Sequence, residues 1–156
     1  MANGTIEVRP ARAADAAAVA ALLSGLGYPQ DAAAAAARIG AWAADPLSEA
    51  FAAVADGEVA GVIAVHAAPY FERAGSWGRI VALVVADSAR GRGVGGALVA
   101  AAEAFAVERG CVRMEVTSAD RREDAHAFYA SRGYTVQTGV SSRFLRDLTA
   151  AAAAPP

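Results

Sequence analysis

The residues best suited to chemistry form a glycine-rich turn led by an arginine, RGRGVGG at positions 90–96. This turn separates an apolar run, LVV at 83–85, from an apolar-periodic stretch that begins near position 93. Glycines let a backbone approach a ligand closely, and the unpaired N–H groups that begin a helix attract anions. The turn therefore predicts a phosphate site, to which Arg90 and Arg92 add positive charge.

Known phosphate loops differ in what must surround their glycines. Gly91 and Gly96 have the spacing of a nucleotide-hydrolase loop, but alanine and leucine follow where lysine and a hydroxyl residue are required, so that loop is excluded. Gly91, Gly93 and Gly96 also match G-x-G-x-x-G, with Glu115 about 20 residues further on. Only roughly 60 residues follow the motif, too few for a doubly wound dinucleotide domain, so an NAD-dependent oxidoreductase is a distant alternative. A turn that only packs a helix against its strand is the plain structural alternative.

Periodicity and turn residues predict the elements that position this turn. Asp15 and Asp31 stand where helices begin, and Asp56-Gly57 is a dipeptide typical of a tight hairpin. The predicted helices cover 15–26, 31–45, 93–110 and 122–131. The predicted strands cover 5–9, 49–56, 58–67, 78–85 and 111–118, followed by a closing antiparallel pair at 134–138 and 142–148. This order predicts a mixed α/β sheet with one parallel crossover.

Length and composition favour one small domain with a small-molecule partner. The chain has 156 residues, and we expect one domain over 1–148 followed by a disordered tail over 149–156. Alanine supplies much of the 56% hydrophobic content, and no run approaches a membrane span of about 18 residues. The start of the chain has no secretory pattern, so we expect a cytoplasmic protein. A formal charge of −2 without long runs of one sign argues against binding to nucleic acid or membranes. A single cysteine, Cys111, excludes an internal disulfide.

A third phosphate pattern carries a resemblance to a known family. Arg90, Gly93 and Gly95 match arginine, two residues, glycine, one residue, glycine, and AHAFYASRGY at 125–134 matches a second signature at the expected separation. The chain resembles the GNAT family of N-acetyltransferases on both segments. The resemblance implies an α/β fold with a mixed, mostly antiparallel sheet, splayed between its fourth and fifth strands and flanked by four helices.

The resemblance also implies acetyl-CoA as the cofactor. Backbone N–H groups of the glycine turn would hold the pyrophosphate, and the open edge of the strand at 78–85 would pair with the amides of the pantetheine arm. The residues expected to contact the cofactor are Leu83, Val84, Val85, Arg90, Gly91, Arg92, Gly93, Val94, Gly95, Gly96 and Tyr129.

Acetyl transfer to an amine needs a neutral amine, a stabilised oxyanion and a proton for the leaving thiolate. The resemblance implies a backbone N–H near Val85 for the oxyanion and Tyr129 as the general acid. Family members often carry a glutamate base on the fourth strand, but residues 79–82 contain no carboxylate. Either the base lies elsewhere, with Glu115, His66 and His126 as the candidates, or the amine is captured already neutral. No metal site is expected.

The acceptor is less specified by the sequence. Within the family the chain is most similar to small bacterial aminoalkylphosphonate N-acetyltransferases. An anionic phosphonate would need Arg73, Arg79 or Arg143, whereas a polycationic aminoglycoside would need Glu72, Glu115 and Asp124. The residues expected to line the acceptor side are Tyr28, Tyr70, Glu72, Trp77, Arg79 and Arg143. A homodimer is expected because the family often dimerises, and a non-catalytic acyl-CoA-binding module is the alternative function.

Overall fold

The computed structural model describes residues 4–149, in two compact units that divide between Thr117 and Ser118. The first unit holds a sheet and three helices, and the second holds one helix and the irregular chain that follows it. Apart from Thr149, the tail expected at 149–156 lies outside the described residues. Within residues 4–149, no helix is long and apolar enough to cross a bilayer.

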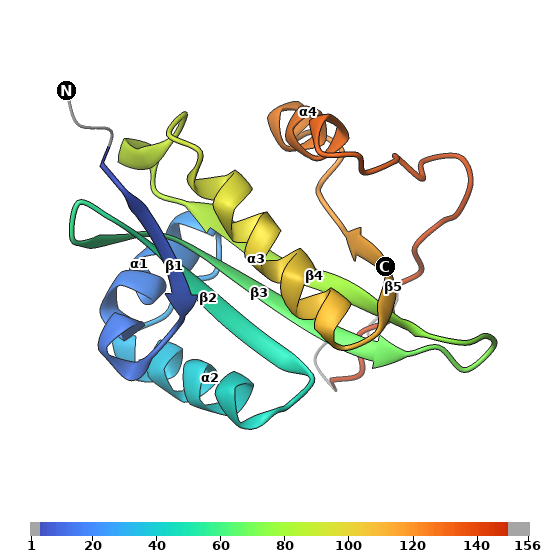
Figure 1. Ribbon diagram of the computed structural model, residues 1–156, viewed down its shortest axis with the longest axis horizontal. Coiled ribbons are helices and arrows are strands. Elements are labelled where there is room, and N and C mark those ends of the chain that lie inside the picture. Colours follow the sequence, from blue (N-terminus) through green and yellow to red (C-terminus); the bar gives the residue numbers. More distant parts are fainter. Residues whose placement is uncertain (1–3, 150–156) are drawn as a thin grey trace. The chain divides into compact units, whose positions relative to one another are not determined.

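The first unit is built on a five-stranded sheet in which the strands lie in chain order, β1 to β5. All neighbouring pairs are antiparallel except β4 and β5, which run parallel. Helix α3, Val94–Glu108, connects these two strands and crosses one face of the sheet, while α1 and α2 cover the other face (Figure 1). The strands are β1 Ile6–Pro10, β2 Ser48–Ala55, β3 Glu58–Pro69, β4 Ser76–Val85 and β5 Cys111–Val116.

The helices and the hairpin turn of the first unit begin and end close to the residues that the sequence predicts for them. Helix α1, Ala16–Leu26, follows Asp15 and ends at Gly27 in the left-handed conformation. Helix α2, Ala32–Ala44, begins after Asp31, whose carboxylate accepts the Ala34 N–H at 2.8 Å. Asp56 and Gly57 both have positive φ, 54° and 79°, in the turn between β2 and β3. The helices and hairpin predicted for this unit are confirmed.

Small residues let the layers of the first unit pack closely. On one face, alanines of α1 and α2 pack with Val19, Ile39 and Val62 around the sheet. On the other face, α3 approaches β3 at Gly61, where a Cβ atom would lie 3.0 Å from Leu98 and from Val94. This alanine-rich packing places α3 and the turn before it firmly against the sheet.

A buried ion pair ties β1 to the start of α1. Arg9 donates to both carboxylate oxygens of Asp15, at 2.7 and 2.9 Å, and the side chain of Asp15 is only 5% exposed. The Arg12 N–H also donates to this carboxylate. Arg9, followed by the Arg12 N–H, holds the pKa of Asp15 below its usual range against the opposing effect of burial.

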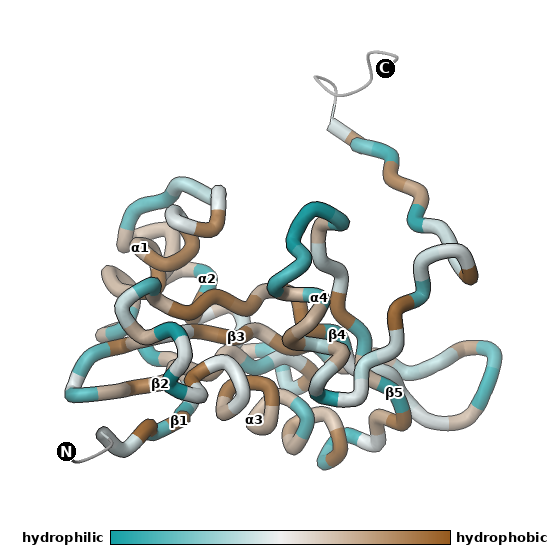
Figure 2. The backbone as a smooth tube through the Cα atoms, turned by 90° about the horizontal axis from the view of Figure 1, so that it is seen from above, coloured by the Kyte–Doolittle hydropathy of each residue, from teal (hydrophilic) through white to brown (hydrophobic). Residues whose placement is uncertain are grey.

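The second unit confirms one prediction and corrects another. Helix α4, Glu123–Ser131, forms where a short helix was predicted. The closing pair of strands at 134–138 and 142–148 is wrong, because residues 135–149 form turns and irregular chain. Apolar and polar residues are mixed along this segment (Figure 2). Such a local pattern does not provide a partner, and an antiparallel pair of short strands is marginally stable unless a further strand or layer supports it.

Candidate functional site

The glycine turn joins β4 to α3 with the backbone geometry of an anion site. After a short 3-10 turn at Asp87–Ala89, Gly91 and Gly93 adopt φ values of +76° and +84°. A Cβ atom at either glycine would meet nothing within 4 Å, so glycine is needed here for its backbone conformation rather than for space. Gly93 is the N-cap of α3 and, among residues 4–149, no side chain caps this helix end. The N–H groups of its first turn are therefore oriented to receive an anion.

The two arginines of the turn have different partners. Arg90 lies 3.1 Å from the Asp87 carboxylate, and its side chain is 61% exposed. Arg92 donates to Asp56 at 2.9 Å and so links the glycine turn to the β2–β3 hairpin. Arg90 is therefore the freer of the two cations to approach a phosphate, while Arg92 also anchors the turn.

β4 has an open edge directly before the glycine turn. Among residues 4–149, it pairs with β5 only from Ser76 to Ile80, which lies opposite Val116, and then continues to Val85 along β3 alone. The sheet is therefore splayed between β4 and β5, as predicted. The register with β3 also skips Val81, since Ile80 lies opposite Val65 and Ala82 lies opposite Ala64. This bulge turns the backbone at the point where the two strands separate.

Three candidate site residues lie in one row across the sheet beside this opening. His66 on β3 lies opposite Arg79 on β4, which lies opposite Glu115 on β5. Arg79 binds the Glu115 carboxylate at 2.8 Å and also reaches the Thr117 hydroxyl at 3.3 Å. The arginine and the carboxylate that would select acceptors of opposite charge therefore neutralise each other here.

His66 also has a hydrogen-bonded support that the sequence did not predict. Its Nδ1 lies 2.7 Å from the Ser48 hydroxyl, which donates to Asp45 at 2.7 Å. The Trp42 ring packs edge-on against the imidazole, with centroids 6.5 Å apart. No local pattern links these residues, because Ser48 and His66 are 18 positions apart and meet only through the β2–β3 pairing.

The second unit carries Tyr129 and His126 on α4. The Tyr129 ring packs edge-on against Phe128 and Tyr134, and burial raises the pKa of its phenol, opposed by the charge of Arg122. His126 Nε2 lies 2.9 Å from the Ala119 carbonyl oxygen, so this nitrogen carries the proton.

The predicted acceptor residues of the first unit are dispersed within it. Tyr28 is 66% exposed in the α1–α2 turn, and Trp77 lies in β4 opposite Ala68. Tyr70 and Glu72 lie in the β3–β4 loop, where the Arg73 guanidinium stacks 4.2 Å from the centre of the Tyr70 ring. That loop and the glycine turn lie at opposite ends of β4, about 30 Å apart along an extended strand of this length. Arg143 lies in the irregular chain after α4.

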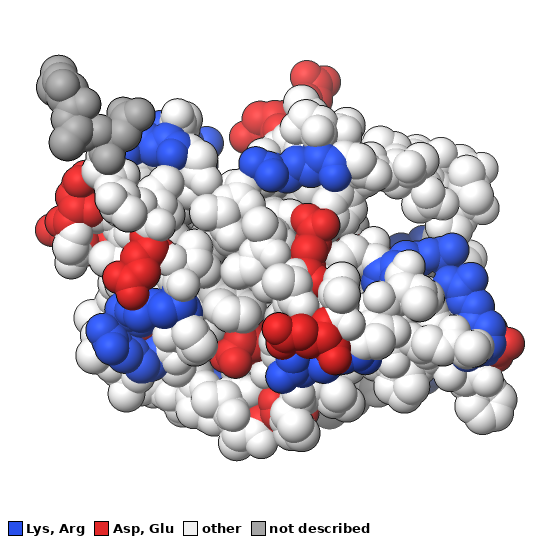
Figure 3. Space-filling view, in the orientation of Figure 1, with Lys and Arg blue, Asp and Glu red and all other residues white. Residues whose placement is uncertain are grey.

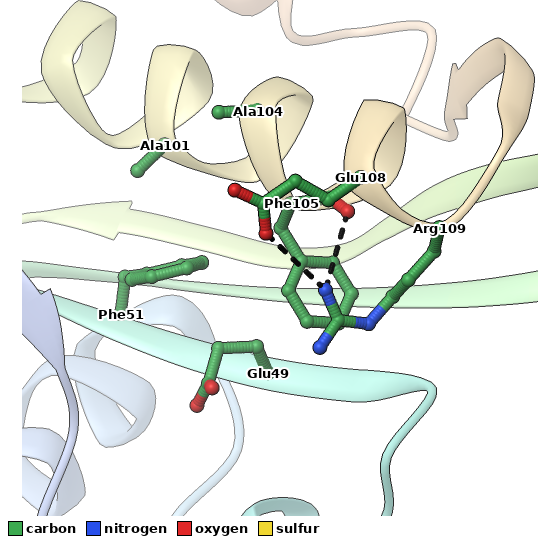
Figure 4. A pocket seen from close by; sticks show the side chains of 7 residues that line it. All are labelled: Glu49, Phe51, Ala101, Ala104, Phe105, Glu108 and Arg109. Atoms are coloured by element: carbon green, nitrogen blue, oxygen red, sulfur yellow. Dashed lines mark hydrogen bonds and ion pairs between the residues drawn. The ribbon is translucent and has the colours of Figure 1, made fainter.

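A separate groove of about 370 Å³ lies between β2 and α3 (Figure 4). The Arg109 guanidinium packs 3.5 Å from the centre of the Phe105 ring and donates to the Pro46 carbonyl at 2.9 Å. None of the predicted site residues lines this groove; its lining residues are Glu49, Phe51, Ala101, Ala104, Phe105, Glu108 and Arg109.

Comparison with known proteins matches both units. The family model described as the acetyltransferase (GNAT) family matches residues 17–134. An aminoalkylphosphonate N-acetyltransferase of Salmonella typhimurium is 38% identical over 82 residues, and this match spans 53% of each chain, about half the length of that relative.

Two solved structures are similar in fold. A GNAT family acetyltransferase of Staphylococcus aureus, 20% identical, superposes with a TM-score of 0.75 over 92% of this chain and 99% of its own. The aminoglycoside N-acetyltransferase AAC(6')-Iy in complex with CoA, 18% identical, superposes with a TM-score of 0.81 over 94% of this chain and 97% of its own.

Proposed function

Because the chain belongs to the GNAT acetyltransferase family, we propose that it moves an acetyl group from acetyl-CoA to the primary amine of a small molecule. Acetyl-CoA is the acetyl donor of this family. The observation that carries the proposal is the uncapped start of α3 next to the open edge of β4. A helix terminus that only packed against its strand would not need two left-handed glycines and an adjacent unpaired strand edge.

The chemical groups of the described residues match those that coenzyme A needs for binding. Its pyrophosphate needs N–H donors and positive charge, which the first turn of α3 and Arg90 offer. Its pantetheine arm contains amides that can pair with the main chain of Leu83, Val84 and Val85 along the open edge of β4. When bound, the thioester would supply the electrophilic carbonyl carbon.

Two further groups of the chain complete the proposed reaction. A backbone N–H near Val85 donates to the carbonyl oxygen as it gains negative charge. Tyr129 gives a proton to the leaving sulfur, and burial keeps its phenol protonated beyond the usual pH range because its pKa is raised.

The acceptor proposed first is a small amine of the aminoalkylphosphonate type. The relative that is 38% identical supports this class. Within the first unit, Glu115 is paired with Arg79, so this sheet row offers no net negative charge that would favour a polycation. Positive and negative side chains are also interspersed on the face shown in Figure 3, as expected for a protein with a small-molecule partner.

Release of free CoA thiol from acetyl-CoA tests this function. The protein is assayed alone and with aminoalkylphosphonates, aminoglycosides, polyamines, amino acids and a lysine-bearing peptide. We expect aminoalkylphosphonates to stimulate release most. Stimulation by aminoglycosides alone would replace the proposed acceptor. Binding of acetyl-CoA without stimulation by any amine would favour a non-catalytic acyl-CoA-binding module, which the absence of a carboxylate at positions 79–82 permits.

A further inference from the structure

His66 is held by a chain of two hydrogen bonds that begins at an anion. The Asp45 carboxylate accepts from the Ser48 hydroxyl at 2.7 Å, and the same hydroxyl oxygen lies 2.7 Å from His66 Nδ1. The carboxylate itself is 3.8 Å from Nδ1. Asp45 precedes β2, Ser48 begins β2, and His66 lies near the end of β3, so the antiparallel pairing of two strands assembles the chain.

The donor and the acceptor of each hydrogen bond between Asp45, Ser48 and His66 can be assigned. The Leu47 N–H, followed by the Ser48 hydroxyl and the charge of His66, holds the pKa of the Asp45 carboxyl below its usual range. An anionic carboxylate only accepts, so the single hydrogen of Ser48 is directed to Asp45. The Ser48 oxygen must then accept from His66, which places a hydrogen on Nδ1. The other ring nitrogen, Nε2, carries the lone pair in the neutral imidazole.

The surroundings of His66 favour one ring orientation while leaving the ring accessible. Ser48 is buried, at 7% exposure, and Trp42 packs edge-on against the imidazole. The His66 side chain is nevertheless 40% exposed. One nitrogen is therefore held against the protein interior while the remainder of the ring can meet a small molecule.

His66 also lies next to the place where the sheet opens. Its cross-strand neighbour is Arg79, and β4 separates from β5 directly after the next residue, Ile80. Cross-strand neighbours lie about 5 Å apart, so the imidazole is close to this opening. The charged groups that face His66 are Asp45 from the turn before β2 and Arg79 from β4, with Glu115 beyond Arg79.

The other candidate bases are engaged differently. The Glu115 carboxylate is bound by Arg79 at 2.8 Å, and His126 Nε2 donates to the carbonyl of Ala119. In the part of the chain that the structure describes, neither is supported by a hydrogen-bonded carboxylate and hydroxyl that would set the position of a proton. Of the three candidate bases, His66 is therefore the one whose hydrogen bonds best orient it to accept a proton.

We propose that His66 Nε2 is the base that deprotonates the acceptor amine, and that Ser48 and Asp45 are positioning residues that select its tautomer and orientation. This proposal rests on the proposed acetyl transfer. One proton of the acceptor ammonium passes to Nε2, which makes the imidazole a cation. The amine lone pair then forms the C–N bond, and the C–S bond breaks with its electron pair going to sulfur. Tyr129, the acid of the proposed function, protonates that sulfur, and the second amine proton restores the Tyr129 phenol. The imidazolium returns its proton to water.

The tautomer provides a test that does not depend on activity. The chain contains two histidines, so nitrogen NMR of the imidazoles, assigned with His126→Gln, resolves His66. In the wild type at a pH where the ring is neutral, we expect the hydrogen on Nδ1. Ser48→Ala should shift the population toward the Nε2–H form, and Ser48→Thr, which keeps the hydroxyl, should restore Nδ1–H. A wild-type ring with its hydrogen on Nε2 would overturn the proposal.

Amine-dependent thiol release measured against pH provides the second test. We expect His66→Gln to lower kcat/KM about 100-fold and to remove the ascending limb of the pH profile. Ser48→Ala should lower kcat/KM about tenfold, as loss of one positioning hydrogen bond would. Ser131→Ala, which removes an exposed hydroxyl bonded to the Phe128 carbonyl, is the matched control and should match the wild type.

The outcomes separate this proposal from the function on which it rests. Active wild-type protein with an unchanged pH profile in His66→Gln would overturn the role of His66 and leave acetyl transfer intact. Wild-type protein that binds acetyl-CoA but releases no thiol with any amine would overturn both.

Discussion

Replacing Gly93 with alanine distinguishes a glycine turn that binds a ligand from one that only packs α3 against its strand. Gly93 has φ +84° at the N-cap of α3, and a Cβ atom there would meet nothing within 4 Å. Alanine therefore introduces no clash, and its cost is the left-handed backbone alone, about 1–2 kcal/mol. For a chain of this size each kcal/mol lowers the Tm by about 2–4 °C, so we expect a decrease of roughly 2–8 °C.

The same substitution should weaken acetyl-CoA binding. If alanine relaxes toward negative φ, the N–H groups of the following residues turn away from the pyrophosphate. We expect the Kd measured by calorimetry to rise at least tenfold, which corresponds to about 1.4 kcal/mol. Gly25→Ala is the matched control, because Gly25 lies exposed inside α1 with nothing near its Cβ position. It should stabilise the fold by about 0.5–1 kcal/mol and leave the Kd unchanged.

Two results would refute this reasoning. An unchanged Tm would mean that the backbone at Gly93 is not strained for alanine. A Tm lowered as expected with an unchanged Kd would mean that the turn serves packing and does not hold the phosphates.

Three further predictions concern other contacts. Tyr129→Phe should lower turnover at least tenfold with little change in acetyl-CoA affinity. Because burial raises the pKa of the Tyr129 phenol, the wild type should lose more stability than the variant as the pH rises above about 10, where the phenol of the unfolded chain ionises. Asp15→Ala should lower the free energy of unfolding by about 3 kcal/mol in urea, because Arg9 is left without its buried partner. Since the pKa of Asp15 is lowered, wild-type stability should also fall as the pH drops below about 4, and a pH series in which the wild type and Asp15→Ala lose stability equally would contradict this. Arg90→Gln should raise the Kd for CoA about fivefold, because a positive charge near the phosphates is lost. If the Kd of the variant equals that of the wild type at both low and high salt, Arg90 does not contact a phosphate.

Features set by nearby residues were predictable from the sequence. Asp31 caps α2, and Asp56-Gly57 turns the β2–β3 hairpin, because each acts through its own backbone. The glycine turn was also predictable, since the positive φ of Gly91 and Gly93 is a local requirement for glycine. Two signatures at their expected separation then indicated the family, and the family match confirms it, together with the fold.

Features that depend on pairing between distant segments were not predictable. The link from Asp45 through Ser48 to His66 exists only because β2 and β3 pair in one register, and a shift by one residue would move His66 to the other face. The ion pair between Arg79 and Glu115 likewise comes from the parallel register of β4 and β5. The closing strands predicted at 134–138 and 142–148 do not form, for the related reason that a local pattern of apolar and polar residues does not supply a pairing partner.

Hydrogen exchange with and without acetyl-CoA tests the central claim most directly, because it reports on the backbone groups assigned to the cofactor. We expect slower exchange at the amides of residues 91–96 and along β4 from 82 to 85 when acetyl-CoA is added. Protection confined to the groove between β2 and α3, or no protection at the glycine turn, would contradict the account.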